Sequence, residues 1–284
     1  MRAFIKYVAV SVLAVFCIQL AGKEYLRVVS LSPAVTEMIF KLGGGNKLVG
    51  RSSACDYPVE VKSIPVAGML GIPDAEKIIS LRANVVITDM VAPGGAWSKL
   101  EKAGIRVVRL NCRRVEDYRN NVMTVGRLLK LEKSADAEVR RFYREIDELK
   151  QNDPDFDIPV LVLLGVNPFV SCNKNTFVDE IVTLAGANNI ARDITLNYFV
   201  LSPEYVIKRN PQAVIAAGVP GDVKKYIRSV TAWKHLDFMQ NDAVIDEIPS
   251  ELLCRLSPRT PQAVKLLRKM LLKKIESKVR PEAR

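Results

Sequence analysis

The feature that most constrains this chain is an alternation of short apolar runs with helical patterns, which occurs twice. In the first half, residues 27–31 and 85–88 are β-branched runs, and each run leads into a helical pattern. In the second half, residues 159–165 form a similar run, and a helical pattern follows over 176–185. Alternation of this kind predicts parallel sheets covered by helices.

One long helical stretch separates the two halves. Residues 134–151 carry apolar residues at helical spacing without a break, and a polar segment that contains two prolines follows. We therefore predict an α/β fold with two Rossmann-like lobes, each with a parallel sheet, joined by one long α-helix. The expected domains are an N-terminal lobe (23–133), a helical connector (134–156) and a C-terminal lobe (157–284), with a ligand cleft between the lobes.

Residues 1–22 have the pattern of a secretory signal peptide. Arg2 and Lys6 precede an uncharged apolar stretch over residues 7–20, and the small residues Ala21 and Gly22 follow it. A membrane span needs about 20 apolar residues, so cleavage is favoured, and an uncleaved N-terminal anchor is the alternative. We expect a periplasmic or other extracytoplasmic location. Without Arg2 and Lys6 the formal charge falls from +11 to +9, which we interpret as solvated surface charge, and no nucleic-acid partner is expected.

The sequence contains no recognisable catalytic or metal-binding motif. There is one histidine, His235, and no Walker, GxSxG or HExxH pattern or GxGxxG after a strand occurs. Cys55, Cys112, Cys172 and Cys254 show no CxxC spacing, so no metal site is expected. These four cysteines allow three pairings, of which the sequence mildly favours pairs within a lobe. We predict a binding protein and no enzyme, with an exported α/β enzyme that uses a cleft cysteine as the alternative.

Several segments resemble one known family in order along the chain. They are RVVSLSPAVTEMIFKLG from Arg27, LVGRSSACDYP at 48–58, DAEKIISLRANVVI from Asp74, LLGVNPF at 163–169, LSPEYVIKRNPQAVI from Leu201, and RLSPR at 255–259. The chain resembles the solute-binding proteins of bacterial ABC importers with a rigid helical connector, and its nearest resemblance is to the cobalamin-binding members.

The resemblance implies a monomer, without a cofactor of its own, that captures vitamin B12 or a related corrinoid. The partner would be an ABC permease with its cytoplasmic ATPase. A ferric siderophore or haem is the alternative ligand, and basic residues in the cleft would favour an anionic siderophore. Arg51, Arg113 and Arg114 are the candidates for such residues.

The resemblance also implies the residues of the ligand cleft. By position they are Ser32, Ala54, Met69, Phe169, Tyr198, Glu251 and Arg255. Ala54 and Met69 stand where the cobalamin binders have aromatic residues, whereas Phe169 and Tyr198 keep aromatic character. Core packing is the alternative for Met69 and the two aromatic residues, and a salt bridge with Glu251 is the alternative for Arg255.

Glu76 and Glu204 fall at the second position of two matching predicted helices, one in each lobe. An acidic residue in the first helical turn is stabilised by the helix macrodipole by about 0.3–1 kcal/mol, which could account for either glutamate. In the family that this chain resembles, such glutamates dock on permease arginines, so we expect Glu76 and Glu204 to be the docking residues.

Overall fold

The computed structural model describes residues 26–151, 157–219 and 221–279. The predicted signal peptide and the last residues of the predicted connector lie outside these ranges. No helix within them is long and apolar enough to cross a membrane.

The N-terminal lobe is built on a four-stranded parallel sheet. Its strands run in the order β2 (Leu48–Arg51), β1 (Val28–Ser30), β5 (Val85–Thr88) and β6 (Arg106–Arg109). The central strands β1 and β5 are buried along their whole length, as expected for β-branched runs that are covered on both faces.

Helices cover both faces of this sheet. The helices α2 (Pro33–Lys41) and α5 (Asp117–Leu129) pack on the face that carries Val28 and Ile87. The helices α3 (Ala75–Ser80) and α4 (Ala96–Lys102) pack on the face that carries Val29 and Val86. A short hairpin of β3 (Gly68–Met69) and β4 (Ile72–Pro73) and two 3₁₀ turns (Gly45–Lys47, Val59–Ser63) complete the lobe.

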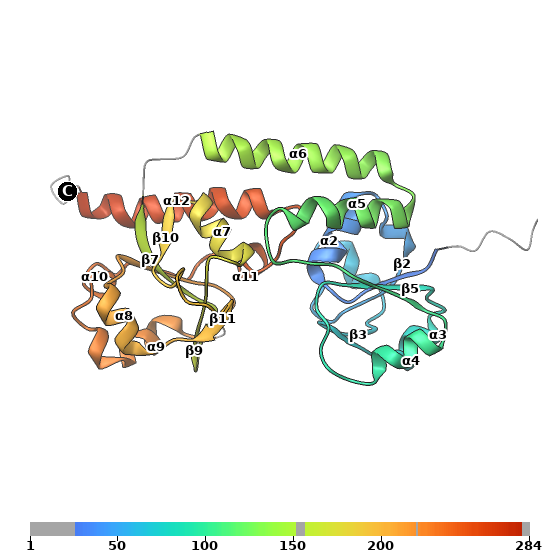
Figure 1. Cartoon of the computed structure of the whole chain (residues 1–284), viewed down its shortest axis with the longest axis horizontal. Coiled ribbons are helices and arrows are strands. Elements are labelled where there is room, and N and C mark those ends of the chain that lie inside the picture. The colour runs from blue at the N-terminus through green and yellow to red at the C-terminus, as the bar shows by residue number, and fades with distance from the viewer. Residues whose placement is uncertain (1–25, 152–156, 220, 280–284) are drawn as a thin grey trace, which may run out of the picture.

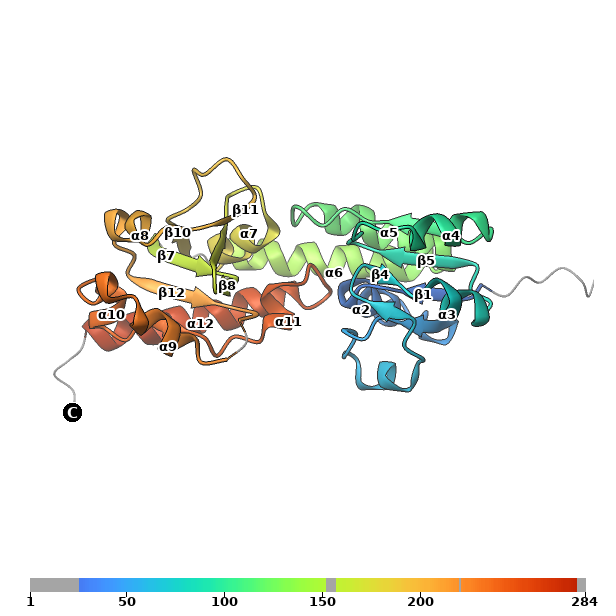
Figure 2. The same ribbon diagram turned by 90° about the horizontal axis from the view of Figure 1, so that it is seen from below.

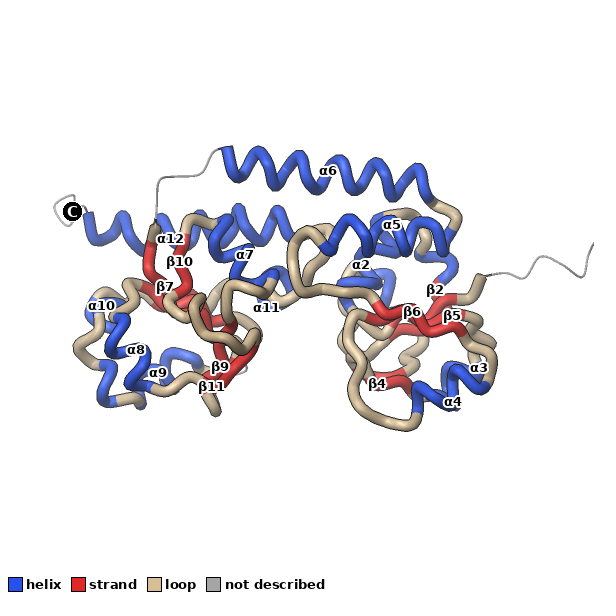
Figure 3. Tube along the Cα trace, viewed as in Figure 1, coloured by secondary structure: helices blue, strands red, loops and turns tan. Residues whose placement is uncertain are grey.

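The C-terminal lobe repeats the strand order of the first. Its parallel sheet runs in the order β10 (Ala187–Asn189), β7 (Ile158–Leu163), β12 (Ala213–Ala216) and β13 (Val244–Ile245). In each four-stranded sheet, therefore, the strand that comes second along the chain lies at one edge, next to the first, and the sheet's third and fourth strands follow on the other side of the first. Figure 3 shows the two sheets as separate groups of strands.

Further elements surround this second sheet. The helices are α7 (Phe177–Leu184), α8 (Pro203–Arg209), α9 (Val223–Ser229), α10 (Asp237–Gln240), α11 (Ser250–Leu253) and α12 (Thr260–Val279), with a 3₁₀ turn at Thr231–Trp233. A three-stranded antiparallel sheet of β8 (Gly165–Val166), β9 (Phe169–Cys172) and β11 (Tyr198–Val200) was not predicted from the sequence.

A single long helix joins the lobes. Helix α6 (Glu132–Gln151) runs along one side of the molecule, over α5 of the first lobe and α12 of the second (Figure 1). Figure 2 shows the lobes side by side along the long axis, with α6 bridging them. The Phe142 ring stacks on Tyr118 of α5 at 3.8 Å between centroids, and the Arg141 Nη2 donates to the Pro258 carbonyl at 2.9 Å.

Helix α6 is thus anchored in both lobes. Its buried stripe of Ala135, Val139, Phe142, Ile146 and Leu149 belongs to an apolar cluster that also includes residues of both sheets. The predicted fold class, with two parallel-sheet lobes and a long helix between them, is confirmed. A helix packed along its length in this way favours small movements between the lobes over a wide hinge motion.

Candidate functional site

A cavity of about 550 Å³ lies between the lobes, where several parallel strands end. The first lobe contributes residues that follow β1, β5 and β6, and the second lobe contributes residues that follow β7 and β12 and residues around α11. Ligands of open α/β sheets bind at this edge. The principal lining residues are Ser32, Ala54, Asp89, Met90, Cys112, Tyr198, Gly218, Ser250, Glu251, Cys254 and Arg255.

Five of the seven predicted cleft residues meet in this cavity. They are Ser32 and Ala54 from the first lobe and Tyr198, Glu251 and Arg255 from the second. Ser32 is held there because its hydroxyl caps α2, where it accepts the backbone N–H of Val35 at 3.4 Å. Pro33 at the first helical position then fixes the direction in which α2 leaves the strand.

Met69 and Phe169 are not among the lining residues. Met69 lies on the β3–β4 hairpin and is 56% exposed, and its neighbour Leu70 lines the cavity in its place. Phe169 packs against Trp233 inside the second lobe, at 4.8 Å between ring centroids. The core packing that the sequence left open for Phe169 is therefore what the structure shows.

The arginine in the cavity is held by carboxylates of the opposite lobe. The Arg255 Nη1 lies 2.7 Å from Asp56 Oδ1 and 3.1 Å from Glu37 Oε1, and its Nη2 lies 3.1 Å from Asp56 Oδ2. Arg259 also donates to Glu37, at 2.7 and 2.9 Å. The salt bridge with Glu251 that was the alternative for Arg255 is not among the ion pairs of the described residues, and Glu37 and Asp56 already compensate the charge of Arg255.

A second interlobe contact lies on α7. Glu180 forms an ion pair with Arg114 and accepts the backbone N–H of Val115 at 2.5 Å.

The arginines that could have made the cleft basic are Arg51, Arg113 and Arg114. Arg51 donates to the backbone carbonyls of Ile64, Ser52 and Cys55. Two of the three arginines that could have made the cleft basic are thus engaged elsewhere, and none of the three lines the cavity.

Asp89 is a charged cavity residue that was not among the predicted ligand contacts. It immediately follows β5, and it lines the cavity together with Ser32 and Cys112 of the same lobe. Burial raises the pKa of this carboxyl above its usual value. The signal was present in the sequence, because the first polar residue after a fully buried parallel strand lies at the ligand-binding edge of a sheet.

Comparison with known proteins identifies the family. A family model described as periplasmic binding protein matches residues 28–251. The chain belongs to this family. A periplasmic binding protein is a transport component rather than an enzyme, and membership implies a small-molecule ligand, a permease partner and an extracytoplasmic location.

Three similar proteins illustrate the range of this periplasmic binding protein's relatives. The uncharacterized ABC transporter substrate-binding lipoprotein YvrC of Bacillus subtilis is 28% identical over 254 residues, which cover 86% of this chain and 79% of the relative. A vitamin B12-binding protein of Pectobacterium atrosepticum is 30% identical over 200 residues, which cover 68% and 71%. The solved periplasmic heme-binding protein RhuT from Roseiflexus sp. RS-1 superposes with a TM-score of 0.77 at 25% identity, covering 88% of this chain and 98% of that one.

The predicted docking glutamates occupy matching positions in the two lobes of this periplasmic binding protein. Asp74 caps α3 and Ser202 caps α8, and Glu76 and Glu204 each stand at the second helical position with exposed side chains. Three residues after each glutamate, an isoleucine is also exposed, Ile79 at 45% and Ile207 at 40%. Both helices lie on the side of the lobes opposite α6 (Figure 1).

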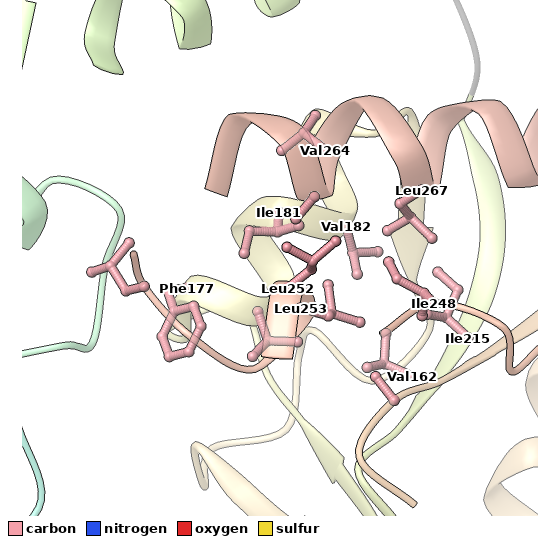
Figure 4. Close-up of a cluster of buried hydrophobic side chains, with 14 of the residues drawn as sticks. Val162, Phe177, Ile181, Val182, Ile215, Ile248, Leu252, Leu253, Val264 and Leu267 are labelled. Carbon is pink, nitrogen blue, oxygen red and sulfur yellow. The ribbon is translucent and has the colours of Figure 1, made fainter. Parts of the chain in front are cut away.

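Helix α11 holds residues at the cavity wall because two of its side chains pack in the core. Leu252 and Leu253 are buried against α7, α12 and the second sheet, as Figure 4 shows. This packing holds the neighbouring Glu251, Cys254 and Arg255 at the cavity wall. The two leucines are therefore structural residues of the site.

All four cysteines of the described chain are free thiols, so the within-lobe pairs that the sequence favoured do not form. No cluster of three or more metal-ligating side chains occurs among the residues that the structure places. Burial raises the pKa of Cys172 to about 12, and it also raises the pKa of Cys112. Tyr198 on β11 is paired with Cys172 on β9, and it lines the same cavity as Cys112 and Cys254.

Proposed function

We propose that this protein captures vitamin B12 or a related corrinoid between its lobes and delivers it to an ABC permease. The observation that supports this class of ligand is the distribution of charge in the cavity. Its one arginine, Arg255, is paired with Glu37 and Asp56, while Asp89 and Glu251 form no ion pair with any described residue. The cavity therefore offers a ligand no free positive charge.

This charge distribution favours a ligand with a neutral rim. Haem carries two propionates and most ferric siderophores are anionic, so either would bring negative charge into a space without a free cation. Desolvating an unpaired charge is costly. The corrin ring of B12 is surrounded by neutral carboxamides, which need hydrogen-bond partners and no counter-charge. The relationship to a vitamin B12-binding protein supports the same ligand class.

An enzyme that uses a cleft cysteine is disfavoured by the state of the thiols. A nucleophilic cysteine needs a lowered pKa, because the thiolate is the reactive form. Burial raises the pKa of Cys112, which lines the cavity, so this thiol is held in the unreactive form.

Delivery would use the outer ends of the two lobes. Glu76 and Glu204 each present an exposed carboxylate on equivalent helices, on the side of the molecule away from α6. Two equivalent carboxylates suit a partner that presents the same basic surface twice. We therefore assign docking on a pair of permease subunits to these residues.

Calorimetric titration of the mature chain tests the ligand class. Cyanocobalamin, haemin and a ferric siderophore are titrated separately at neutral pH. We expect saturable heat with cyanocobalamin and affinities at least about tenfold weaker, a difference of roughly 1.4 kcal/mol, with the other two. Saturable heat with haemin or the ferric chelate, and none with cyanocobalamin, would assign the protein to iron transport.

A further inference from the structure

Asp89 is positioned rigidly at the wall of the ligand cavity. The preceding residue, Thr88, ends β5, and its hydroxyl donates to the Met90 carbonyl at 2.6 Å and accepts the Met90 N–H at 3.2 Å. These two bonds fix the backbone on both sides of Asp89. The backbone from which the Asp89 side chain projects is therefore held at the end of the sheet rather than in a loose loop.

The carboxyl of Asp89 retains acceptor capacity that the protein does not use. Ser32 and Cys112 are the polar side chains of the same lobe that line the cavity with it, and no ion pair between described residues includes it. The positive charge of Arg255 attracts the Asp89 carboxyl. The Arg255 guanidinium donates its hydrogen bonds to Glu37 and Asp56, however. A carboxylate can accept about four hydrogen bonds, so acceptor sites remain for a ligand.

We propose that Asp89 selects the ligand by the chemistry of its rim, accepting hydrogen bonds from amide N–H groups and disfavouring carboxylates. This inference rests on the proposed function, because it assumes that the ligand occupies the cavity that Asp89 lines. It adds a residue that determines specificity and that the resemblance to the family did not indicate.

The physical reason is the difference between the two kinds of partner. An amide N–H donates to the carboxylate and stabilises its charge, and a hydrogen bond to a charged group contributes roughly 1.5–3 kcal/mol. A carboxylate on the ligand would face Asp89 as a like charge, and two close carboxyls cannot both ionise without a penalty. Glu251 on the opposite wall presents the same problem to a second carboxylate.

The test holds the ring constant and changes only its rim. One pair of ligands is a corrinoid with its rim carboxamides and the same corrin hydrolysed to the rim carboxylates. The second pair is haemin bis-amide and haemin. Each ligand is titrated into the wild type, Asp89→Asn and Asp136→Asn. Asp136 is exposed on α6 and loses the same charge when it is changed.

We expect the wild type to prefer the amide member of each pair that binds by at least about tenfold. Asp89→Asn should reduce this preference by about tenfold or more, because the asparagine amide can donate to a ligand carboxylate. Asp136→Asn should leave the preference unchanged. Asp89→Asn should also retain the melting temperature, since the charge it removes is one that burial disfavours.

The results separate this inference from the proposed function. If only the haem pair binds and Asp89→Asn reduces its amide preference, the inference holds although the corrinoid proposal fails. If an amide preference is absent in the wild type, or persists unchanged in Asp89→Asn, the inference is overturned even though corrinoids bind. Failure of both pairs to bind would also overturn it.

Discussion

The two lobes are alike on their outer helices and unlike at the cleft. Helices α3 and α8 match position by position, with a capping side chain, an exposed glutamate, a buried aliphatic residue and an exposed isoleucine. At the cleft, the first lobe presents Ser32, Asp89 and Cys112, and the second presents Tyr198, Glu251 and Arg255. The strand order is the same in both lobes, so the fold alone does not cause this difference.

The contrast indicates what each surface meets. Equivalent residues at the ends of both lobes suit a partner that offers the same surface twice, such as a pair of identical subunits related by twofold symmetry. A ligand held between the lobes has no such symmetry, so the walls around it are free to differ. Under the proposed function, the helices α3 and α8 would contact the permease and the residues of the cleft would contact the ligand.

The largest effect is expected from removing both outer glutamates. Glu76→Ala combined with Glu204→Ala should abolish ligand uptake in cells, because both carboxylates that would pair with the permease are lost. Ligand affinity should stay within about twofold of the wild type, since neither residue lines the cavity. Uptake assays and calorimetry on the same variant check the two halves of this prediction.

Glu132→Ala with Asp136→Ala is the matched control for that experiment. Both residues are exposed on α6, on the opposite side of the molecule, and the pair removes the same charge. Uptake should be normal in this control. Wild-type uptake by the Glu76 and Glu204 double variant would show that the matched outer helices do not dock the permease.

The contacts between the lobes offer a second comparison. Each lobe forms an ion pair with the other through a glutamate on the first helix after the first strand of its sheet. Glu37 of α2 is 2% exposed and pairs with Arg255 and Arg259. Glu180 of α7 is 21% exposed and pairs with Arg114. Glu37→Gln should lower the free energy of unfolding by about 3 kcal/mol, because it leaves the partly buried Arg259 without its carboxylate partner and Arg255 with Asp56 alone.

Glu180→Gln should cost only about 1 kcal/mol, since Arg114 is 42% exposed and regains water when the pair is broken. Urea unfolding of the two variants at neutral pH measures the difference. Equal losses would mean that the two contacts are equivalent, so that the lobes are as symmetric at this junction as on their outer helices.

The elements of the fold were largely predictable because their determinants are local. Ser32, Asp74, Thr176 and Ser202 each cap the helix that follows them, and a capping side chain needs only residues two or three positions away. The strand at Val85–Thr88 was predicted with the bounds that the structure shows.

The partners within the site were not predictable in the same way. Arg255 and Asp56 are 199 residues apart in sequence, and Arg255 and Glu37 are 218 apart. A single sequence carries no signal that links positions so distant. Phe169 was assigned to the cleft by its position in the family resemblance, but it packs against Trp233, 64 residues later, at the core of the second lobe.

The smallest effects concern two aspartates of the first lobe whose pKa values move in opposite directions. The hydrogen bond from Arg255 lowers the pKa of Asp56 below 3.8, whereas burial raises that of Asp89 above it. The pairing of Asp56 should therefore stabilise the fold above about pH 3.8 and lose this contribution as the pH falls through the lowered folded-state pKa. Because Asp56 is 49% exposed, the contribution should be under about 1 kcal/mol.

Asp89 should act with the opposite sign. Its raised pKa means that the folded state binds the proton more tightly than the unfolded state does, so stability falls as the pH rises from about 3.8 through the folded-state pKa. Melting temperatures measured between about pH 3 and 8 distinguish the two. Asp56→Asn should melt below the wild type only toward neutral pH, and Asp89→Asn should melt at or above it there. A bound ligand with amide donors should reduce the loss of stability that ionised Asp89 causes in the wild type, because those donors stabilise the charged carboxyl. An unchanged pH profile with ligand bound would argue that the ligand does not contact Asp89.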